Sequence, residues 1–135
     1  MADAVTSQTI QDGQRVAFMR FTNVSDGSGE AAVKKVDVSA LNSNAAGEAC
    51  SSVDIARVWW ATVGMSVKVD FDASANVLAL TIPADSTGDE YYDDFTAIPN
   101  NAAASGFTGD LDFTTLGHSS GDTYMIVLKL IKKYG

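Results

Sequence analysis

The only histidine, His118, lies in a glycine-rich stretch that also holds serine and aspartate, the side-chain types of a catalytic triad. A triad requires an exposed nucleophile, a base beside it, an acid that orients the base, and an oxyanion hole. Ser119 and Asp122 instead share one short turn with His118, without a Gly-x-Ser-x-Gly pattern. The sequence therefore predicts a polar loop here and a protein that is not an enzyme.

One acidic stretch has the alternating oxygen ligands that open a calcium-binding loop of the EF-hand type. It consists of Asp70, Asp72, Ser74 and Asn76. The sixth position of such a loop requires glycine but holds Ala75, and the twelfth requires a bidentate glutamate but holds Thr81. We therefore expect a polar β-turn at this point, and we predict no metal and no cofactor.

A second acidic group is predicted to form a surface loop, and its part from Asp89 to Asp94 is a candidate contact with a partner protein. Its members are Asp85, Asp89, Glu90, Asp93 and Asp94. Solvated charge is the simplest reading of such a loop, and weak calcium binding is an alternative. The chain has a formal charge of −8, and no Lys or Arg occurs between Lys68 and Lys129. This charge repels nucleic acid and suits docking between protein surfaces.

Two further features are candidate contacts. Trp59 and Trp60 are adjacent in a predicted strand and therefore point to opposite faces, so one is expected in the core while the other is covered or exposed. An exposed tryptophan stacks on a sugar or anchors a protein interface. The basic end of the chain, with Lys132, Lys133 and Tyr134, is predicted to project as a contact point.

The length and composition of the chain indicate how many domains carry these residues. The chain has 135 residues, of which 46% are hydrophobic, and this favours one folded domain over residues 1–135. Because no run of about 18 apolar residues and no leader pattern occurs, we expect neither membrane spanning nor standard secretion. Cys50 is the only cysteine, so no disulfide forms within the chain.

Alternation of apolar and polar residues with a period of two recurs along the chain and predicts strands. The predicted strands are 4–10, 15–24, 31–38, 53–62, 65–72, 77–82, 91–95, 109–115 and 123–132. The turn at Val63-Gly64 predicts a hairpin, followed by a third strand in a meander. Residues 41–49 are the one candidate for a short helix. The last strand is apolar on both faces, so it is buried between sheets or covered by another subunit.

These features predict an all-β protein, a single-domain antiparallel β-sandwich of jelly-roll-like type with about eight strands and at most one short helix. Glycine-rich turns separate the strands at suitable spacings. Residues 1–9 are in addition a candidate extended arm that adds a strand to a neighbour.

Three stretches together carry a resemblance to a known group of proteins. They are Phe21 to Glu30 with Val33 to Val38, then Arg57-Val58-Trp59-Trp60, and then Thr114 to Lys132. They resemble small virion structural proteins of tailed phages, particularly marine and cyanobacterial phages. The shared residues form turns and strands, so no functional residue is carried over.

The resemblance implies a capsid decoration or cement protein on the exterior of the virion, made in the host cytoplasm. Its partner would be the major capsid protein, and it would assemble as a homo-oligomer, with a trimer favoured. The alternatives are a tail, neck or fibre component of the virion, or a carbohydrate-binding module.

Overall fold

The computed structural model describes residues 3–92 and 97–134, and within them nearly all regular structure is β. The prediction of an all-β sandwich is confirmed. The strands are β1 (Ala4–Asp12), β2 (Val16–Val24), β3 (Val33–Val36), β4 (Cys50–Val63), β5 (Ser66–Phe71), β6 (Val77–Ile82), β7 (Thr87–Tyr91), β8 (Leu111–Leu116) and β9 (Thr123–Tyr134).

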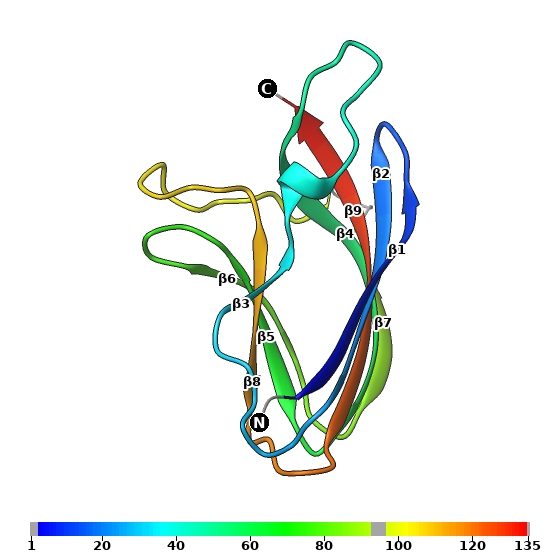
Figure 1. Cartoon of the computed structure of the whole chain (residues 1–135), viewed down its shortest axis with the longest axis vertical. Coiled ribbons are helices and arrows are strands. Elements are labelled where there is room, and N and C mark those ends of the chain that lie inside the picture. Colours follow the sequence, from blue (N-terminus) through cyan, green and yellow to red (C-terminus); the bar gives the residue numbers. More distant parts are fainter. Residues whose placement is uncertain (1–2, 93–96, 135) are drawn as a thin grey trace.

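Two antiparallel sheets face each other (Figure 1). One has the order β1-β2-β9-β4-β7, and the other has the order β3-β8-β5-β6. When β1 is left aside, the first of the remaining strands pairs with the last, the second with the last but one, and so on inward. The pairs are β2 with β9, β3 with β8, β4 with β7, and β5 with β6. This nested pairing is the arrangement of a jelly roll, in which two antiparallel sheets enclose one core.

The core lies between the inward faces of the two sheets, as the alternation in the sequence predicts. In β2 and β9 every second residue is buried, and the inward residues of β5 face them. Phe113 lies at the centre of an aromatic group, with its ring centre 5.1 Å from that of Phe21 and 6.0 Å from that of Tyr124. Both pairs are close to edge-to-face, a preferred geometry for aromatic rings.

Three predicted elements differ in the structure. Residues 53–62 and 65–72 do not form a hairpin, because Gly64, at a φ of 83°, turns the chain from one sheet into the other. The strand expected at 91–95 ends at Tyr91 and begins at Thr87, and residues 93–96 lie outside the described part. The segment 41–49 is not helical, because its turn is held by hydrogen bonds to Asn44; a 3-10 turn lies just before it, at Val38–Ala40.

Residues 4–12 belong to this chain's own sheet. β1 pairs along its length with β2, so this segment is an edge strand rather than a free arm. On the outer face the hydroxyl groups of Thr6 and Thr22 are hydrogen-bonded across the pair. The other edge of β1 is unpaired within the described residues.

Candidate protein interface

The outer face of the five-stranded sheet is apolar along its centre. β9 is the central strand, and its outward residues alternate with buried ones. The half-buried apolar residues on this face include Val16 and Phe18 of β2, Trp59 of β4, and Met125, Val127 and Ile131 of β9. This explains why β9 is apolar on both sides, because one side packs in the core and the other forms part of the surface.

Cations and aromatic rings alternate on this face. The guanidinium carbon of Arg57 lies 4.5 Å from the centre of the Trp59 ring and 5.2 Å from that of Tyr91. The Nζ atom of Lys129 lies 6.0 Å from the Tyr91 ring centre, and the Phe18 and Trp59 rings are 6.4 Å apart. With Arg20, which lies opposite Val127 on the same face, these residues form what we call the cationic aromatic face: Phe18, Arg20, Arg57, Trp59, Tyr91 and Lys129.

Strand register brings these residues together from four strands. Residues directly opposite each other in a sheet point to the same face. Arg57 lies opposite Lys129 of β9 on one side and Tyr91 of β7 on the other. Phe18 of β2 also lies opposite Lys129. Five of the six residues of the face therefore lie on the interior strands β2, β9 and β4, and Tyr91 lies on the neighbouring edge strand β7.

One carboxylate, Asp89, fixes the central arginine. Arg57 donates from Nε to Asp89 Oδ1 at 2.8 Å and from Nη2 to the other carboxylate oxygen. These hydrogen bonds lower the pKa of Asp89, so the pair stays ionised at neutral pH. Bidentate pairing holds the guanidinium in the geometry that places it over the two rings.

This face has the chemistry of a protein-binding surface. Trp, Tyr and Arg are the residue types that dominate the energetics of protein interfaces, and here Arg57 lies over both Trp59 and Tyr91. Three cations against one carboxylate make the face locally basic, although the whole chain has a charge of −8. Such a surface is complementary to a partner that presents apolar and acidic groups.

Comparisons with family models, with curated protein sequences and with solved structures find no match to this chain. Within the described residues, no helix has the length and apolar character needed to span a membrane. Function is therefore inferred from the geometry of the molecule, together with the resemblance in its sequence.

The two predicted tryptophans lie on opposite faces and have different surroundings. Trp59 belongs to the cationic aromatic face, whereas Trp60 lies opposite Ile126 and packs partly against the core. Trp60 donates from Nε1 to the hydroxyl oxygen of Ser86 at 2.9 Å. A Cβ atom at Gly88 would lie 2.3 Å from the Trp60 ring, so this position requires glycine. Trp60 is therefore a structural residue of the β4–β7 pair.

The acidic group predicted as one loop is divided by the fold. Asp89 and Glu90 lie in β7 and point to opposite sides, because they pair with Trp59 and Val58 respectively. The expectation of a loop here is wrong for these two residues. Asp93 and Asp94 lie outside the described residues.

The predicted contact at the end of the chain is wrong for Lys132. Its ammonium group is buried and bonds to Asp12 Oδ1 at 2.5 Å and to the carbonyl oxygens of Gly13 and Asn42 at 2.8 Å each. The end does not project, because β9 continues to Tyr134, whose hydroxyl donates to the carbonyl oxygen of Gln14. Lys133 is exposed and lies 3.5 Å from Asp54.

Sequence reasoning missed most of the cationic aromatic face. A signal for part of it exists: Arg57 and Trp59 are two residues apart in a strand and so share a side. The sequence predicts Tyr91 at the start of a strand over residues 91–95, whereas in the structure Tyr91 ends β7. The contributions of Phe18 and Lys129 depend on which strands are neighbours in the sheet. That order is a property of the whole fold and cannot be read from local alternation.

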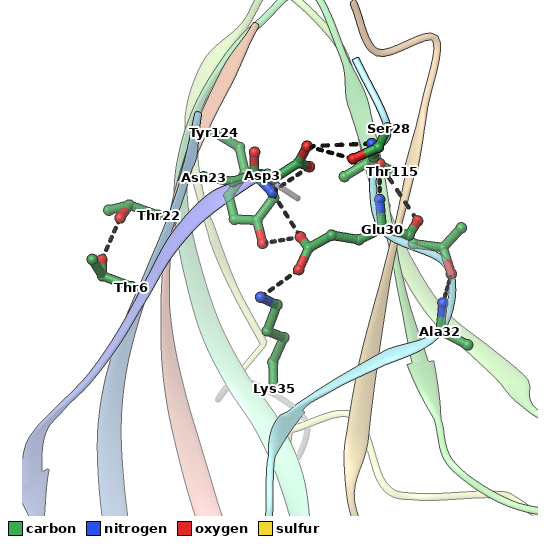
Figure 2. A network of polar contacts seen from close by, with 12 residues as sticks. Asp3, Thr6, Thr22, Asn23, Ser28, Glu30, Ala32, Lys35, Thr115 and Tyr124 are labelled. Atoms are coloured by element: carbon green, nitrogen blue, oxygen red, sulfur yellow. Dashed lines mark hydrogen bonds and ion pairs between the residues drawn. The ribbon is translucent and has the colours of Figure 1, made fainter. Parts of the chain in front are cut away.

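A buried polar network lies between the sheets at the end where the chain starts (Figure 2). Glu30, on the connection from β2 to β3, accepts from Tyr124 at 2.6 Å and from Asn23 at 2.9 Å, and it pairs with Lys35 at 2.5 Å. Its backbone N–H donates to Thr115 at 2.8 Å. Because Asn23 and Tyr124 belong to one sheet and Lys35 and Thr115 to the other, Glu30 connects both.

The protonation of Tyr124 suits its place in this network. Burial, together with the hydrogen bond to Glu30 and the charge of that carboxylate, raises the pKa of the Tyr124 hydroxyl. The hydroxyl therefore remains protonated and donates to Glu30. The network has the features of a structural connection, since its charged members are paired inside the protein.

The residues first considered for a catalytic triad make local contacts in their own turn. His118 Nδ1 lies 3.2 Å from the Thr115 hydroxyl, while Asp122 accepts from the backbone N–H of Ser119. The described part of the chain holds no group of three His, Cys, Asp or Glu side chains arranged for a metal ion.

Asp72, from the stretch considered for calcium binding, forms a carboxyl pair with Asp112 of β8. Asp112 is buried and raised in pKa to about 6, chiefly by burial and further by the neighbouring Asp72 carboxyl. Asn76 donates to Asp112 at 3.1 Å, and Thr108 donates to Asp72 at 2.7 Å. The ionised form of Asp112 is therefore destabilised where it lies.

This pair predicts a specific dependence of stability on pH. Between the ordinary pKa of 3.8 and about 6, folded Asp112 binds a proton that the unfolded chain does not, so its contribution to stability is present below about pH 4 and lost as the pH rises through 6. At neutral pH, Asp112→Asn should therefore raise the free energy of unfolding, on the order of 2 kcal/mol. Urea unfolding at neutral pH and near pH 4 measures this.

Asp37→Asn supplies the contrast. Hydrogen bonds from Ser39 lower the pKa of Asp37, so its contribution is present at neutral pH and is lost on acidification. Asp37→Asn should thus destabilise at neutral pH, opposite in sign to Asp112→Asn. An Asp112→Asn gain that is equal at both pH values would contradict the assignment.

Proposed function

We propose that this chain is a non-enzymatic binding protein that docks through its cationic aromatic face onto the outside of a phage capsid and stabilises contacts between major capsid protein subunits. The observation that carries the proposal is the arrangement of Arg57 over Trp59 and Tyr91 on an open sheet face. The choice of a capsid as partner rests on the resemblance in the sequence. The fold alone does not distinguish a capsid partner from a carbohydrate ligand, because jelly rolls occur in both capsid and lectin domains.

Docking of this kind stabilises a shell by mass action. A protein that binds only the assembled state raises its stability as site occupancy increases, by about 2.7 kcal/mol per site at a hundredfold excess over Kd. A contact that spans two capsid subunits would also oppose their separation. The locally basic face and the acidic remainder of the chain favour one orientation on the shell.

The carbohydrate-binding alternative is less consistent with the site. Sugar stacking needs an open aromatic ring face, and the Arg57 guanidinium lies over the ring of Trp59. Tail, neck or fibre attachment would use the same docking chemistry, so only a binding experiment distinguishes it from the capsid.

The proposal predicts saturable co-sedimentation with expanded capsids that lack the protein, together with a raised capsid melting temperature. Trp59→Ala should weaken binding on the order of thirtyfold, because it removes an aromatic anchor. Arg57→Lys should also weaken it, since lysine keeps the charge but loses both the bidentate pair with Asp89 and the planar stacking.

Phe107→Ala is the matched control, because Phe107 is an exposed aromatic residue outside this face. Unfolding curves of all three variants establish that they are folded. Failure of the unmodified protein to bind capsids would reject the capsid proposal, and binding to purified tails would move the site there. Equal binding by all variants would reject the cationic aromatic face.

A further inference from the structure

The open edge of β1 lacks the devices that normally protect a sheet edge. β1 has nine residues, and all but Asp12 are exposed. Residues 4–11 contain no charged residue and no proline, and they include the β-branched Val5, Thr6, Thr9 and Ile10. An edge strand of this kind presents unpaired backbone N–H and C=O groups that favour pairing with another strand.

The other three edges are protected or less accessible. β3 has only four residues and carries the exposed Lys34, and β7 carries Asp89 and Glu90 beside Gly88. β6 is also uncharged, but it is three residues shorter than β1, and four of its six residues are half-buried or buried. β1 is therefore the edge with the greatest capacity for pairing.

Both ends of β1 are anchored by carboxylates. At its start, Asp3 accepts hydrogen bonds from Asn23 at 3.0 Å and from the N–H groups of Asp26 and Gly29 at 3.1 and 3.3 Å (Figure 2 shows the side chain). Burial opposes the charge of Asp3, but these hydrogen bonds outweigh it and lower its pKa. At the other end, Asp12 pairs with the buried Lys132.

The anchored ends hold the uncharged segment between them in a fixed, extended conformation. Binding to such an edge does not first require ordering of the strand, which would otherwise oppose association. Val5 and Ile10, with 46% and 54% of their surface exposed, supply apolar area that a neighbouring strand would cover.

We propose that β1 pairs with β1 of a second copy of this chain, antiparallel about a two-fold axis, and joins two five-stranded sheets into one. The distribution of charge favours a second copy of this chain as the partner of the β1 edge. An edge that pairs with its own copy places identical or nearby residues opposite each other, and like charges there are destabilising. Pairing of β3 with its copy would bring the two exposed Lys34 side chains together, and pairing of β7 would bring acids together, whereas residues 4–11 of β1 bring no charges together.

A register centred on Ser7 satisfies the geometry. It places Val5 opposite Thr9 and Thr6 opposite Gln8, so residues that face outward in one copy lie beside outward residues of the other. These residues precede the β-bulge between Thr9 and Gln11, so the strand is regular where the pairing occurs. The result is a two-fold dimer, which differs from the trimer that the sequence resemblance implies.

The dimer would carry two cationic aromatic faces on the same side of one continuous sheet. The pairing itself does not depend on what those faces bind. If they dock as proposed above, two linked faces bind a repetitive surface more tightly than one, because the second contact is intramolecular.

Sedimentation equilibrium of the full chain over a wide range of concentrations tests the pairing. The unmodified protein should show a monomer–dimer equilibrium. Ser7→Lys and Ser7→Glu should each weaken dimerisation on the order of tenfold or more, because each places like charges opposite one another at the axis. An equimolar mixture of the two variants should recover association, since lysine then faces glutamate.

Recovery in the mixture shows that both variants are folded and that the charges meet. Leu78→Lys is the matched control, because it introduces the same charge at an exposed position of β6 and should leave the dimer unchanged. A protein that stays monomeric at all concentrations, a trimer insensitive to either Ser7 substitution, or no recovery in the mixture would overturn the pairing.

Discussion

Glu30→Gln should lower the free energy of unfolding by about 3 kcal/mol or more. The substitution leaves the Lys35 ammonium, whose side chain is 4% exposed, without its charged partner inside the protein. It also replaces an acceptor of the Tyr124 and Asn23 hydrogen bonds by a group that includes a donor. Urea unfolding followed by tryptophan fluorescence measures the loss.

Glu90→Gln is the matched control, because Glu90 is exposed on β7, and a change within about 0.5 kcal/mol is expected. Adding Lys35→Met to Glu30→Gln should recover part of the loss, since no charge then remains buried. Two results would contradict a stabilising role for the network. One is a loss of unfolding free energy in Glu30→Gln no larger than in Glu90→Gln, and the other is a loss in the Glu30→Gln/Lys35→Met double variant equal to the sum of the two single losses.

Lys132→Met should lower the free energy of unfolding by about 3 kcal/mol, because it leaves Asp12 and two carbonyl oxygens without their common donor. Burial opposes the charge on Lys132, but its hydrogen bonds to Asp12 and Tyr134 outweigh this and raise its pKa above the ordinary 10.5. The contribution is therefore complete below pH 10.5 and is lost as the pH rises through the folded-state pKa.

Lys133→Met provides the comparison one residue along. The Lys133 side chain is 55% exposed, whereas that of Lys132 is fully buried. Exposed ion pairs contribute little, so a change under about 1 kcal/mol is expected. Similar losses for the two variants at neutral pH would show that the buried site has no special role in stability.

The difference between these two lysines shows what local alternation in the sequence predicts and what it does not. Local alternation identified most strands of the sandwich, because each strand that lines the core must place apolar residues at every second position. The same alternation places Lys132 on the inward side of β9, after Leu128 and Leu130. Nothing local shows that Asp12, near the other end of the chain, lies there to pair with it.

The candidate interface was partly predictable for the same reason. Residue type indicates Trp59 and Trp60 as candidate anchors on opposite faces of one strand, and only the structure shows that Trp59 is the one on the outer face. Arg57 and Tyr91 acquire their role only from the neighbours that register assigns them. The Glu30–Lys35 pair left no signal, because a charged residue in a turn is expected at the surface.

The nested order of the strands also bears on how the chain folds. β5 and β6 are joined by a short turn and can pair at once, whereas β2 must wait for β9, whose first residue, Thr123, is synthesised 99 positions after Val24 at the end of β2. Such distant pairing closes large loops and places all-β domains among the slow-folding proteins. On the ribosome, the first strands therefore remain without their central partner until β9 has emerged, and during that interval the uncharged β1 is the segment most exposed to mispairing with other chains.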